Sequence, residues 1–461
     1  MNTSITRLFG VLLVLFALLV GATSWWTVFG AEKLRTNPNN HRILLAEQRI
    51  KRGTISADDG TVLARARPLG KDRWGRRYPQ GTLFAQPVGC NSINNGNAGL
   101  EDYYNDALTG RRTELVSAVD SLLGPHNVGD DLRTTLSPKA QKVATDGLAG
   151  KPQKGAVVAI ELKTGAVKAL AAKPSYDPNT GQCGANFNLA TQGLFPPGST
   201  MKTVTAAAAL DTGKFQPSST LNGRSPQTIS GAPLNNFNNE QFGDIDLTAA
   251  LTHSVNTVFA QVAVRLGKQT MADYMDRFGF YVDPPMDYPD GEMAPSGEFL
   301  RGKPLPDTSR FIDVGRMGIG QDKLLVTPLQ MAEVAQTIGN GGVRMEPRLV
   351  SKVVDTDGRT VDQPLPKEAK RVMSADAAAK LTVMMKNVVK EGTGTAAALT
   401  GVDVAGKTGT AELNNTGLDD AWFIGFTDRF AVAVVVDRVQ GGQGGVVAAP
   451  IAKAVLQALG S

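Results

Sequence analysis

Histidine and cysteine are scarce in this chain of 461 residues, which contains three of the former and two of the latter. The histidines His41, His126 and His253 show none of the spacings by which side chains share a metal ion, so the sequence predicts neither a metal site nor a cofactor. The cysteines, Cys90 and Cys183, lie far apart in the chain. One disulfide in an oxidising compartment and two buried free thiols are both compatible with this spacing, and the sequence leaves both alternatives open.

Charge of one sign is not concentrated anywhere in the chain. Lys and Arg number 48 against 43 Asp and Glu, a formal net charge of +5, without a basic block or a basic stretch interleaved with aromatic residues. This pattern argues against nucleic acid as a partner. Internal repeats and long low-complexity linkers are also missing, and 42% of the residues are hydrophobic. A chain of this length and composition is expected to fold into two or three domains.

One long stretch lacks charge altogether. Between Arg7 and Glu32 the sequence reads LFGVLLVLFALLVGATSWWTVFGA, which is long enough to cross the hydrocarbon core of a membrane as a helix. Trp25 and Trp26 stand where aromatic residues favour a membrane interface. A cleaved signal peptide is the alternative, but the stretch exceeds an ordinary signal-peptide core, so we interpret residues 1–31 as a short cytoplasmic tail and a transmembrane anchor. The basic residues on either side of the span do not decide its orientation.

The chain after the membrane span divides into two regions at about residue 130. Residues 32–130 contain short apolar runs and many turn residues, typical of a small, irregular membrane-proximal module. Residues 131–461 begin and end with strand-like runs, such as GAVVAIELKTGAVKALAA and FAVAVVVDRV, and read as helical between about residues 199 and 341. We therefore expect an α+β multidomain protein whose largest domain assembles its sheet from distant parts of the chain.

A serine and a lysine stand three residues apart at the start of the helical region. The segment PPGSTMK, which ends at Lys202, is followed by an alanine-rich run, and together they predict a helix from about Ser199 to just before Gly213. Residues three apart share a helix face, so Ser199 and Lys202 point into the same space. An isolated S-x-x-K pattern is more often a capping serine followed by a surface lysine, so a functional interpretation needs independent support.

Two later motifs supply that support. SVN at residues 254–256 lies between two helical patterns, and KTG at residues 407–409 lies on a strand-like run near the C-terminus. Earlier copies, SIN at 92–94 and KTG at 163–165, precede Ser199 and are explained by an asparagine-rich loop and a hairpin turn. Only the later copies give the order serine-lysine, serine-asparagine, lysine-threonine-glycine. A cap of the following helix is the alternative for the SVN motif.

The three motifs in this order are the set found in penicillin-binding proteins and class A β-lactamases. Further landmarks run along the chain: RGTISADDGTVLA from Arg52, GLEDYYNDALTG from Gly99, PSYDPN from Pro174, GIGQDKLLVTPLQMA from Gly318 and EGTGTAA from Glu391. With them the chain resembles the class B penicillin-binding proteins, and its short membrane-proximal module is most similar to that of the actinobacterial penicillin-binding protein A group. Class A members need a glycosyltransferase domain, for which this module is too short.

The resemblance implies a fold, an activity and a location. Residues 131–461 would form a transpeptidase domain with a mainly antiparallel five-stranded sheet flanked by helices. The implied enzyme is a serine D,D-transpeptidase that attacks D-Ala-D-Ala stem peptides of peptidoglycan, releases D-alanine and is inhibited covalently by β-lactam antibiotics. It would span the cell membrane once, with its catalytic domain outside the cytoplasm, beside a lipid-II polymerase of the SEDS type. The resemblance does not decide whether the enzyme serves septation or elongation. It also leaves open which diamino acid the acceptor stem peptide carries.

Ser199 is the nucleophile that the resemblance implies. A serine hydroxyl must lose its proton to a nearby base, and the resemblance gives this part to Lys202, whose pKa would be lowered by burial and by the second cation, Lys407. The same resemblance assigns Ser254 to relaying a proton toward the leaving amine. It assigns Asn256 to holding the amide of the substrate.

The strand that carries the third motif is implied to bind the substrate. Lys407, Thr408 and Thr410 would contact its carboxylate, and the backbone N–H groups of Ser199 and Thr410 would form the oxyanion hole. Gly409 would let the backbone of the substrate approach this strand closely and pair with its edge.

Two other functions compete with this interpretation. A β-lactamase or D,D-carboxypeptidase uses the same motifs with water as acceptor, but the anchor, the extra module and the lack of an E-x-x-L-N stretch between Asn256 and Lys407 argue against a free-standing lactamase. A vestigial domain that only recruits a polymerase is the non-enzymatic alternative, and the intact motifs argue against it. His253 stands beside Ser254, as a histidine of a catalytic triad could. No G-x-S-x-G elbow is present, however, so we interpret His253 as a structural residue.

Overall fold

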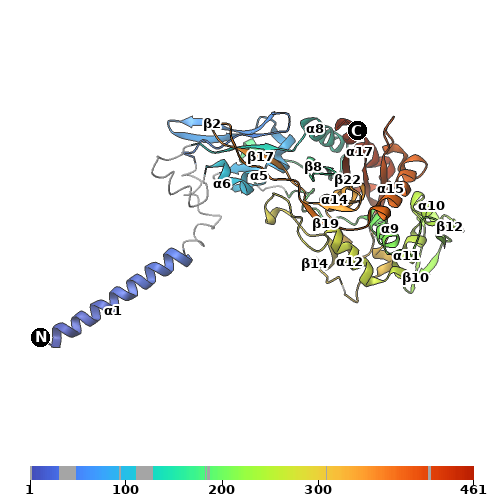
Figure 1. The fold of residues 1–461 in the computed structure, drawn as a ribbon, viewed down its shortest axis with the longest axis horizontal. Helices are drawn as coiled ribbons and strands as arrows, with labels where there is room; N and C mark the ends of the chain where they lie inside the picture. The colour runs from blue at the N-terminus through green and yellow to red at the C-terminus, as the bar shows by residue number, and fades with distance from the viewer. Residues whose placement is uncertain are drawn as a thin grey trace.

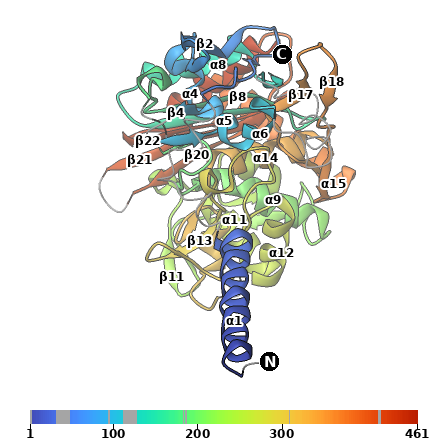
Figure 2. The ribbon, with the colours of Figure 1, turned by 90° about the vertical axis from the view of Figure 1, so that its left-hand side faces the viewer.

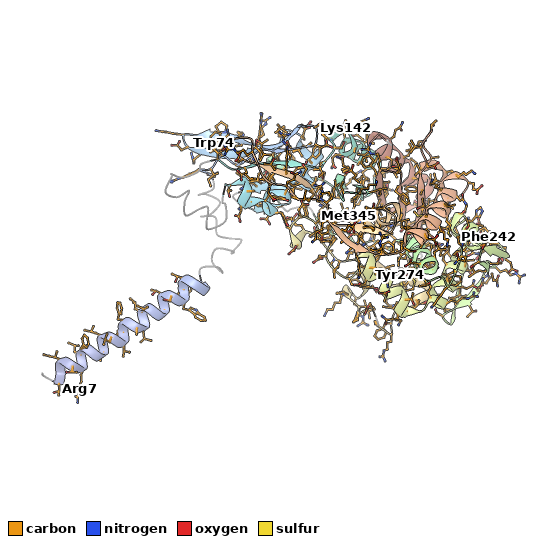
Figure 3. All side chains as sticks on the ribbon, viewed as in Figure 1. Arg7, Trp74, Lys142, Phe242, Tyr274 and Met345 are labelled. Atoms are coloured by element: carbon orange, nitrogen blue, oxygen red, sulfur yellow. A yellow bond between two sulfur atoms is a disulfide. The ribbon has the colours of Figure 1, made fainter. Side chains whose placement is uncertain are left out.

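A computed structural model describes residues 3–30, 48–92, 95–110, 128–181, 183, 187–307, 309–413 and 417–460. Figure 1 shows helix α1 (Thr3–Trp25) apart from the folded body, and a π-helical turn, η1 (Trp26–Gly30), continues it. Within these described ranges, Ile5–Trp25 is the one helical segment long and apolar enough to cross a membrane, with a mean hydropathy of 2.4. Its side chains project away from the helix without packing against the body (Figure 3).

A six-stranded sheet forms the part of the body that follows the anchor in sequence. Its strands, in spatial order, are β18 (Thr360–Asp362), β17 (Val350–Val354), β6 (Asp131–Thr134), β1 (Ile55–Ser56), β2 (Val62–Gly70) and β3 (Arg73–Arg77). Neighbouring strands run antiparallel except β1 and β6, which are parallel. Strands from distant parts of the sequence therefore lie side by side in this sheet (Figure 1).

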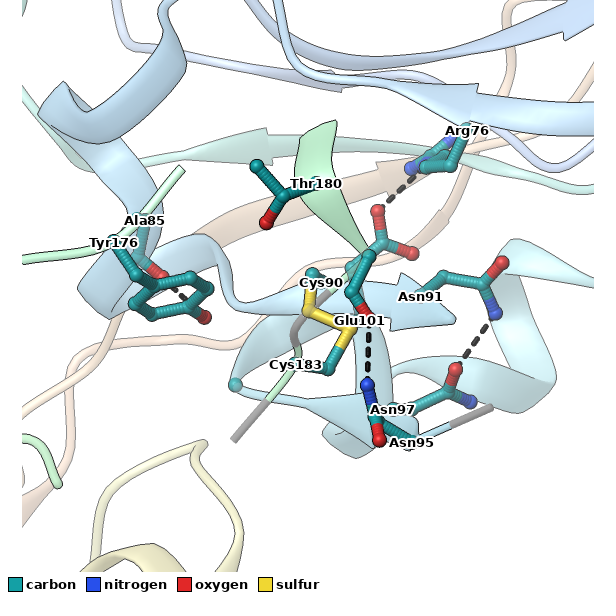
Figure 4. Close-up of a disulfide and its surroundings, with 12 residues drawn as sticks. Arg76, Ala85, Cys90, Asn91, Asn95, Asn97, Glu101, Tyr176, Thr180 and Cys183 are labelled. Carbon is teal, nitrogen blue, oxygen red and sulfur yellow. Dashed lines mark hydrogen bonds and ion pairs between the residues drawn. A yellow bond between two sulfur atoms is a disulfide. The ribbon is translucent and has the colours of Figure 1, made fainter. Parts of the chain in front are cut away.

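Short elements and a disulfide complete this region. They are η2 (Gly81–Phe84), α4 (Ala85–Val88), β4 (Cys90–Ser92), β5 (Gly96–Ala98), α5 (Leu100–Tyr103) and α6 (Asn105–Leu108). Cys90 on β4 is bonded to Cys183, so the disulfide is the alternative that the structure supports (Figure 4). Beside it the buried carboxylate of Glu101 pairs with Arg76 at 2.5 Å and with Arg52 at 3.0 Å. Residues 93 and 94 of the SIN copy lie outside the described residues.

The main sheet has five strands, in the order β20 (Ala405–Glu412), β21 (Leu418–Phe426), β22 (Phe430–Gln440), β7 (Gly155–Glu161) and β8 (Val167–Lys173). Every neighbouring pair is antiparallel, which confirms the expected five-stranded sheet. The KTG copy at 163–165 lies in the tight turn between β7 and β8, as predicted. Gly165 has a φ of +69° there, a conformation that glycine adopts without steric cost.

Helices cover both faces of the main sheet (Figure 2). Successive residues of a strand point to opposite faces, so Val157 of β7 packs in one core with α8 (Pro138–Ala149) and α17 (Ala449–Ala458). Its neighbour Val158 packs in the larger core with α14 (Pro328–Gly339). Because both faces are buried, these strands read as continuous apolar runs rather than as alternating ones.

The helical insert between the two ends of the sheet carries the remaining elements. Its helices are η3 (Pro178–Thr180), η4 (Gly198–Met201), α9 (Lys202–Asp211), η5 (Phe237–Asn239), α10 (Leu247–Thr252), α11 (Asn256–Leu266), α12 (Lys268–Phe278), η6 (Asp290–Glu292) and α13 (Val314–Met317), and α15 (Ala375–Lys390), η7 (Thr395–Ala397) and α16 (Gly444–Val447) follow later. Its short strands are β9 (Thr220–Asn222), β10 (Gln227–Ile229), β11 (Ala232–Leu234), β12 (Asp244–Asp246), β13 (Gly297–Leu300), β14 (Lys303–Pro304), β15 (Leu324–Leu325), β16 (Val343–Met345) and β19 (Glu368–Arg371). Helix α9 is buried on all sides from residue 202 to residue 210, because its alanines allow neighbouring elements to approach closely.

Candidate active site

Ser199 lies on a single 3-10 turn, η4, that leads directly into α9. The predicted helix therefore starts where the sequence indicated, but its first turn is tighter than an α-helix. Gly198 has a φ of +52°, and a Cβ there would lie 2.7 Å from the carbonyl oxygen of Thr410. Trp422 of β21 also donates a hydrogen bond from its indole to Pro196 O at 3.0 Å. These contacts hold the serine turn tightly against the β20 edge of the main sheet.

Lys202, the first residue of α9, is fully buried. Its Nζ lies 2.6 Å from the carbonyl oxygen of Ser254, 2.7 Å from Oδ1 of Asn256 and 3.2 Å from Oγ of Ser254. Within the part of the chain that the structure describes, it makes no hydrogen bond to Ser199. The S-x-x-K and S-x-N motifs are therefore joined through the lysine, which the sequence order alone did not show.

Both motif lysines have strongly lowered pKa values. Burial, and then the positive charge of Lys407, lowers the pKa of Lys202 well below its usual range. Burial lowers the pKa of Lys407 to about 7. A neutral Lys202 has two N–H bonds, which the two carbonyl oxygens accept, and one lone pair. Burial and the charge of Lys407 thus shift Lys202 toward the neutral amine, which is the form that a general base requires.

Ser254 lies in the turn between α10 and α11, with a φ of +60° that is unusual for a residue other than glycine. Its Oγ stands between the two amines, 3.2 Å from Nζ of Lys202 and 2.9 Å from Nζ of Lys407. The alternative of a helix cap is wrong, because Val255 occupies the N-cap of α11 and no side chain caps it. The strained backbone thus directs this hydroxyl toward the lysines rather than toward the helix.

Asn256 is anchored at both ends of its amide. Oδ1 accepts from Lys202 at 2.7 Å, and Nδ2 donates to the carbonyl oxygen of Asn235 at 3.0 Å. One N–H and one lone pair of this amide remain for another molecule.

The third motif lies on β20, which is the edge strand of the main sheet. Nζ of Lys407 also donates to Thr408 O at 3.0 Å, and the hydroxyl of Thr408 lies 2.6 Å from that of Thr393. Gly409 also has a packing role. A Cβ at this position would lie 2.8 Å from Pro197 O and 2.9 Å from Cγ2 of Thr200, so the glycine lets β20 approach the serine turn.

A cavity of about 240 Å³ lies over these groups. Of the predicted site residues, Ser199, Ser254, Asn256, Thr408 and Thr410 line it. The two lysines and the glycine lie beneath, fully buried or nearly so. All eight predicted residues therefore belong to one region of the molecule.

The cavity also has lining residues that the sequence reasoning missed. They include Phe237, Glu240, Gln321, Thr393, Glu412 and Gln443. Thr393 belongs to the EGTGTAA landmark, but no spacing rule singled out its hydroxyl. His253 lies at the rim, where its exposed ring stacks on Phe242 with ring centroids 5.8 Å apart. This contact agrees with a structural role for the histidine.

Comparisons with known proteins agree with this geometry. The family model described as "Penicillin binding protein transpeptidase domain" matches residues 155–457, and the one described as "Penicillin binding protein A dimerisation domain" matches residues 52–132. The peptidoglycan D,D-transpeptidase PbpA of Mycolicibacterium smegmatis is 33% identical over 99% of this chain and 99% of its own length.

Solved structures of penicillin-binding protein A from M. tuberculosis are similar to the whole folded body. A ceftriaxone acyl-enzyme complex has a TM-score of 0.80 at 30% identity, over 90% of this chain and 99% of that one. A penicillin G acyl-enzyme complex has a TM-score of 0.79 at 31% identity, over 89% of this chain and 100% of that one. Fold, motif geometry and these similarities agree, and this chain belongs to the class B penicillin-binding proteins, the serine D,D-transpeptidases of peptidoglycan synthesis.

Proposed function

We propose that Ser199 is the nucleophile of this transpeptidase and that Lys202 is its base. The observation that carries the proposal is the hydrogen-bonded chain of Lys202, Ser254 and Lys407 beside the cavity that Ser199 lines. Burying two amines with lowered pKa values does not stabilise a fold. The lowered pKa values favour the neutral form that a base requires.

The acylation half of the reaction uses these groups in sequence. Oγ of Ser199 attacks the carbonyl carbon of the penultimate D-alanine while its proton passes to Nζ of Lys202. The backbone N–H groups of Ser199 and Thr410 stabilise the negative oxygen of the tetrahedral intermediate. Ser254 passes a proton to the leaving nitrogen as the C–N bond breaks, and the terminal D-alanine departs. An ester between Ser199 and the stem peptide remains.

The second half reverses the proton path. The amine of a neighbouring stem peptide attacks the ester carbonyl, its proton leaves through the same groups, and the Ser199 hydroxyl is restored as the new amide forms. Asn256 holds an amide of the substrate in both halves, and the hydroxyls of Thr408 and Thr410 with the ammonium of Lys407 bind the terminal carboxylate until the D-alanine departs. The edge position of β20 supports this binding mode, because an extended peptide can add to that edge.

The proposal extends to inhibitors, partners and location. β-Lactam antibiotics would acylate Ser199, a view supported by the acyl-enzyme complexes of the mycobacterial relative. A lipid-II polymerase of the SEDS type is the proposed protein partner. The helix α1 supports a single-pass anchor in residues 1–31, and the Cys90–Cys183 disulfide supports an extracytoplasmic position for residues 32–130 (the module) and 131–461 (the transpeptidase domain).

The decisive experiment is to label the protein with a penicillin and map the modified peptide by mass spectrometry. The added mass is expected on Ser199, because this serine alone lies on a helix-leading turn in the cavity with the base one turn further on. A label on Ser254 would exchange the two roles. The Ser199→Ala variant should take no label, whereas Ser219→Ala, at a serine outside the cavity, should be labelled like the wild type.

A further inference from the structure

The hairpin of β2 and β3 projects beyond the rest of its sheet. β1 pairs with β2 only at Val62 and Ala64, so the remainder of the hairpin is a two-stranded ribbon, marked by Trp74 in Figure 3. The chain that follows the anchor reaches this ribbon directly, because the backbone N–H of Trp74 donates to Gln48 O at 2.7 Å. Residues 31–47 separate Gln48 from the end of the described anchor segment. A chain of that length reaches at most about 65 Å, so the ribbon is tethered within reach of the membrane surface.

The two faces of the ribbon carry different residues. Residues paired across antiparallel strands point to one face, and Ala66 pairs with Arg76 on the face that packs against the module. The guanidinium of Arg76 is buried there against the carboxylate of Glu101, at 2.5 Å. The opposite side, here called the arginine face, consists of exposed side chains at alternate positions of both strands: Arg65, Arg67, Leu69, Arg73 and Arg77.

The charges of the arginine face are not compensated within the protein. None of its four arginines makes an ion pair or a side-chain hydrogen bond in the ranges that the structure describes. Arg65 and Arg77 stand directly opposite each other, and like charges in this arrangement destabilise a strand pair. Asp72, in the turn, is the only acidic residue between positions 62 and 77. An anionic partner would therefore remove a repulsion that the isolated protein retains.

Protection of a sheet edge is the alternative explanation for these charges. β3 is the last strand of its sheet, and charged residues on such a strand hinder pairing with another chain. An acidic residue opposite Arg65 would protect the edge equally well and would also stabilise the strand pair. Edge protection thus explains the presence of charge but not its uniform sign. The uniform positive charge indicates a negatively charged partner.

We propose that the arginine face binds the anionic lipid headgroups of the membrane leaflet from which the anchor emerges. The inference rests on the proposed single-pass anchor. Guanidinium groups donate paired hydrogen bonds to phosphate oxygens, and basic side chains next to a membrane anchor are attracted to an anionic surface. Leu69 is 43% exposed in the middle of this face and adds an apolar contact with the interface. Docking of the ribbon would orient the module, and the domain that follows it, relative to the membrane.

Quenching of a fluorophore on the ribbon by nitroxide-labelled lipid headgroups measures this contact. The full-length protein carries the fluorophore at Lys71→Cys in the turn, since Cys90 and Cys183 are bonded to each other and take no label. It is reconstituted into vesicles of phosphatidylcholine, with or without phosphatidylglycerol. Quenching should be much stronger with phosphatidylglycerol. Each arginine near an anionic surface favours docking about fivefold, so Arg65→Gln, Arg67→Gln and Arg73→Gln together should lower the ratio of docked to undocked ribbon about a hundredfold.

The matched control is a second triple variant, Arg224→Gln, Arg265→Gln and Arg301→Gln. It removes the same charge from exposed positions of the transpeptidase domain and should be quenched like the protein with all its arginines. Equal quenching in the two kinds of vesicle, or an equal loss in both triple variants, would overturn the inference. An unquenched ribbon in a protein that instead sediments with isolated peptidoglycan would also overturn it, because the partner would then be the wall polymer.

Two further measurements separate this failure from that of the proposed function. Flotation of the wild type with the vesicles tests the anchor, and a protein that does not float would overturn both the anchor and the inference. Labelling by penicillin tests the nucleophile and shows that each variant is folded, because no residue of the ribbon lines the catalytic cavity. A wild type whose label is not on Ser199 would overturn the proposed nucleophile and leave the lipid contact to be decided by the quenching.

Discussion

Replacing Lys407 with methionine is expected to stabilise the protein at acidic pH while it removes one of the proposed catalytic groups. Lys407 is fully buried, and burial lowers its pKa from the usual 10.5 to about 7. Since one pKa unit corresponds to about 1.4 kcal/mol, holding the protonated lysine in the fold costs about 5 kcal/mol. Methionine has a similar length but leaves Ser254 Oγ and Thr408 O without this donor, a loss of about 1–3 kcal/mol. The expected net gain at pH 6 is therefore about 2–4 kcal/mol.

The sign of this effect depends on pH. Below pH 7 the lysine is protonated in the folded and the unfolded protein, so the whole cost is present. Between pH 7 and pH 10.5 only the unfolded protein binds the proton, and the stability of the wild type rises with pH relative to the variant. By pH 10 the electrostatic cost has almost vanished, and the lost hydrogen bonds make Lys407→Met the less stable protein.

Thermal unfolding of the full-length protein in detergent at pH 6 and pH 10 measures this difference as a shift in Tm. Lys407→Met should melt several degrees above the wild type at pH 6 and at or below it at pH 10. Lys453→Met is the control, because this lysine is exposed on α17 and should shift Tm little at either pH. A variant that melts below the wild type at pH 6, or a shift that does not change with pH, would refute the reasoning.

Three further results are expected. Lys202→Ala should slow acylation by penicillin at least about a hundredfold in stopped-flow measurements, because the base is lost, and a wild-type rate would contradict the role. Gly409→Ala should slow acylation and lower Tm, since its Cβ would lie 2.8 Å from Pro197 O, whereas Gly291→Ala, with nothing within 4 Å, should change neither. The penicilloyl ester on Ser199 should persist for minutes to hours after free drug is removed, because no E-x-x-L-N stretch supplies a base for water, and loss within seconds would favour a β-lactamase.

The motifs could be predicted from the sequence because each one is local. The turn before Ser199 follows from two prolines and a glycine, and the KTG strand follows from its apolar run. Their order along the chain then excluded the copies at 92–94 and 163–165. The main sheet was predictable for a similar reason, since strand-like runs occur at both ends of residues 131–461.

Contacts between segments that are distant in the sequence could not be predicted from local patterns. Strands β17 and β18 join the sheet of the membrane-proximal module, yet their short, half-exposed sequences show no sign of that pairing. The Cys90–Cys183 bond depends on the same long-range folding. Thr393 reaches Thr408 through a loop whose residues look like ordinary turn residues. Register and loop closure are properties of the assembled fold, and the sequence pattern does not encode them locally.

The hydrogen bonds around Lys202 also constrain the order of proton transfer. Two carbonyl oxygens accept from Nζ of Lys202, and in the proposed reaction the lone pair of its neutral form accepts from the hydroxyls of Ser199 and Ser254 in turn. While Lys407 is protonated it donates to Ser254 Oγ at 2.9 Å, and the hydroxyl hydrogen of Ser254 is free to turn toward Lys202 at 3.2 Å. In the proposed reaction, Ser199 can pass its proton to Lys202 only when the hydroxyl hydrogen of Ser254 does not point at Nζ of Lys202. In the proposed reaction the leaving nitrogen gains an accepting lone pair only in the tetrahedral intermediate, so the Ser254 hydroxyl turns to it after Ser199 has attacked.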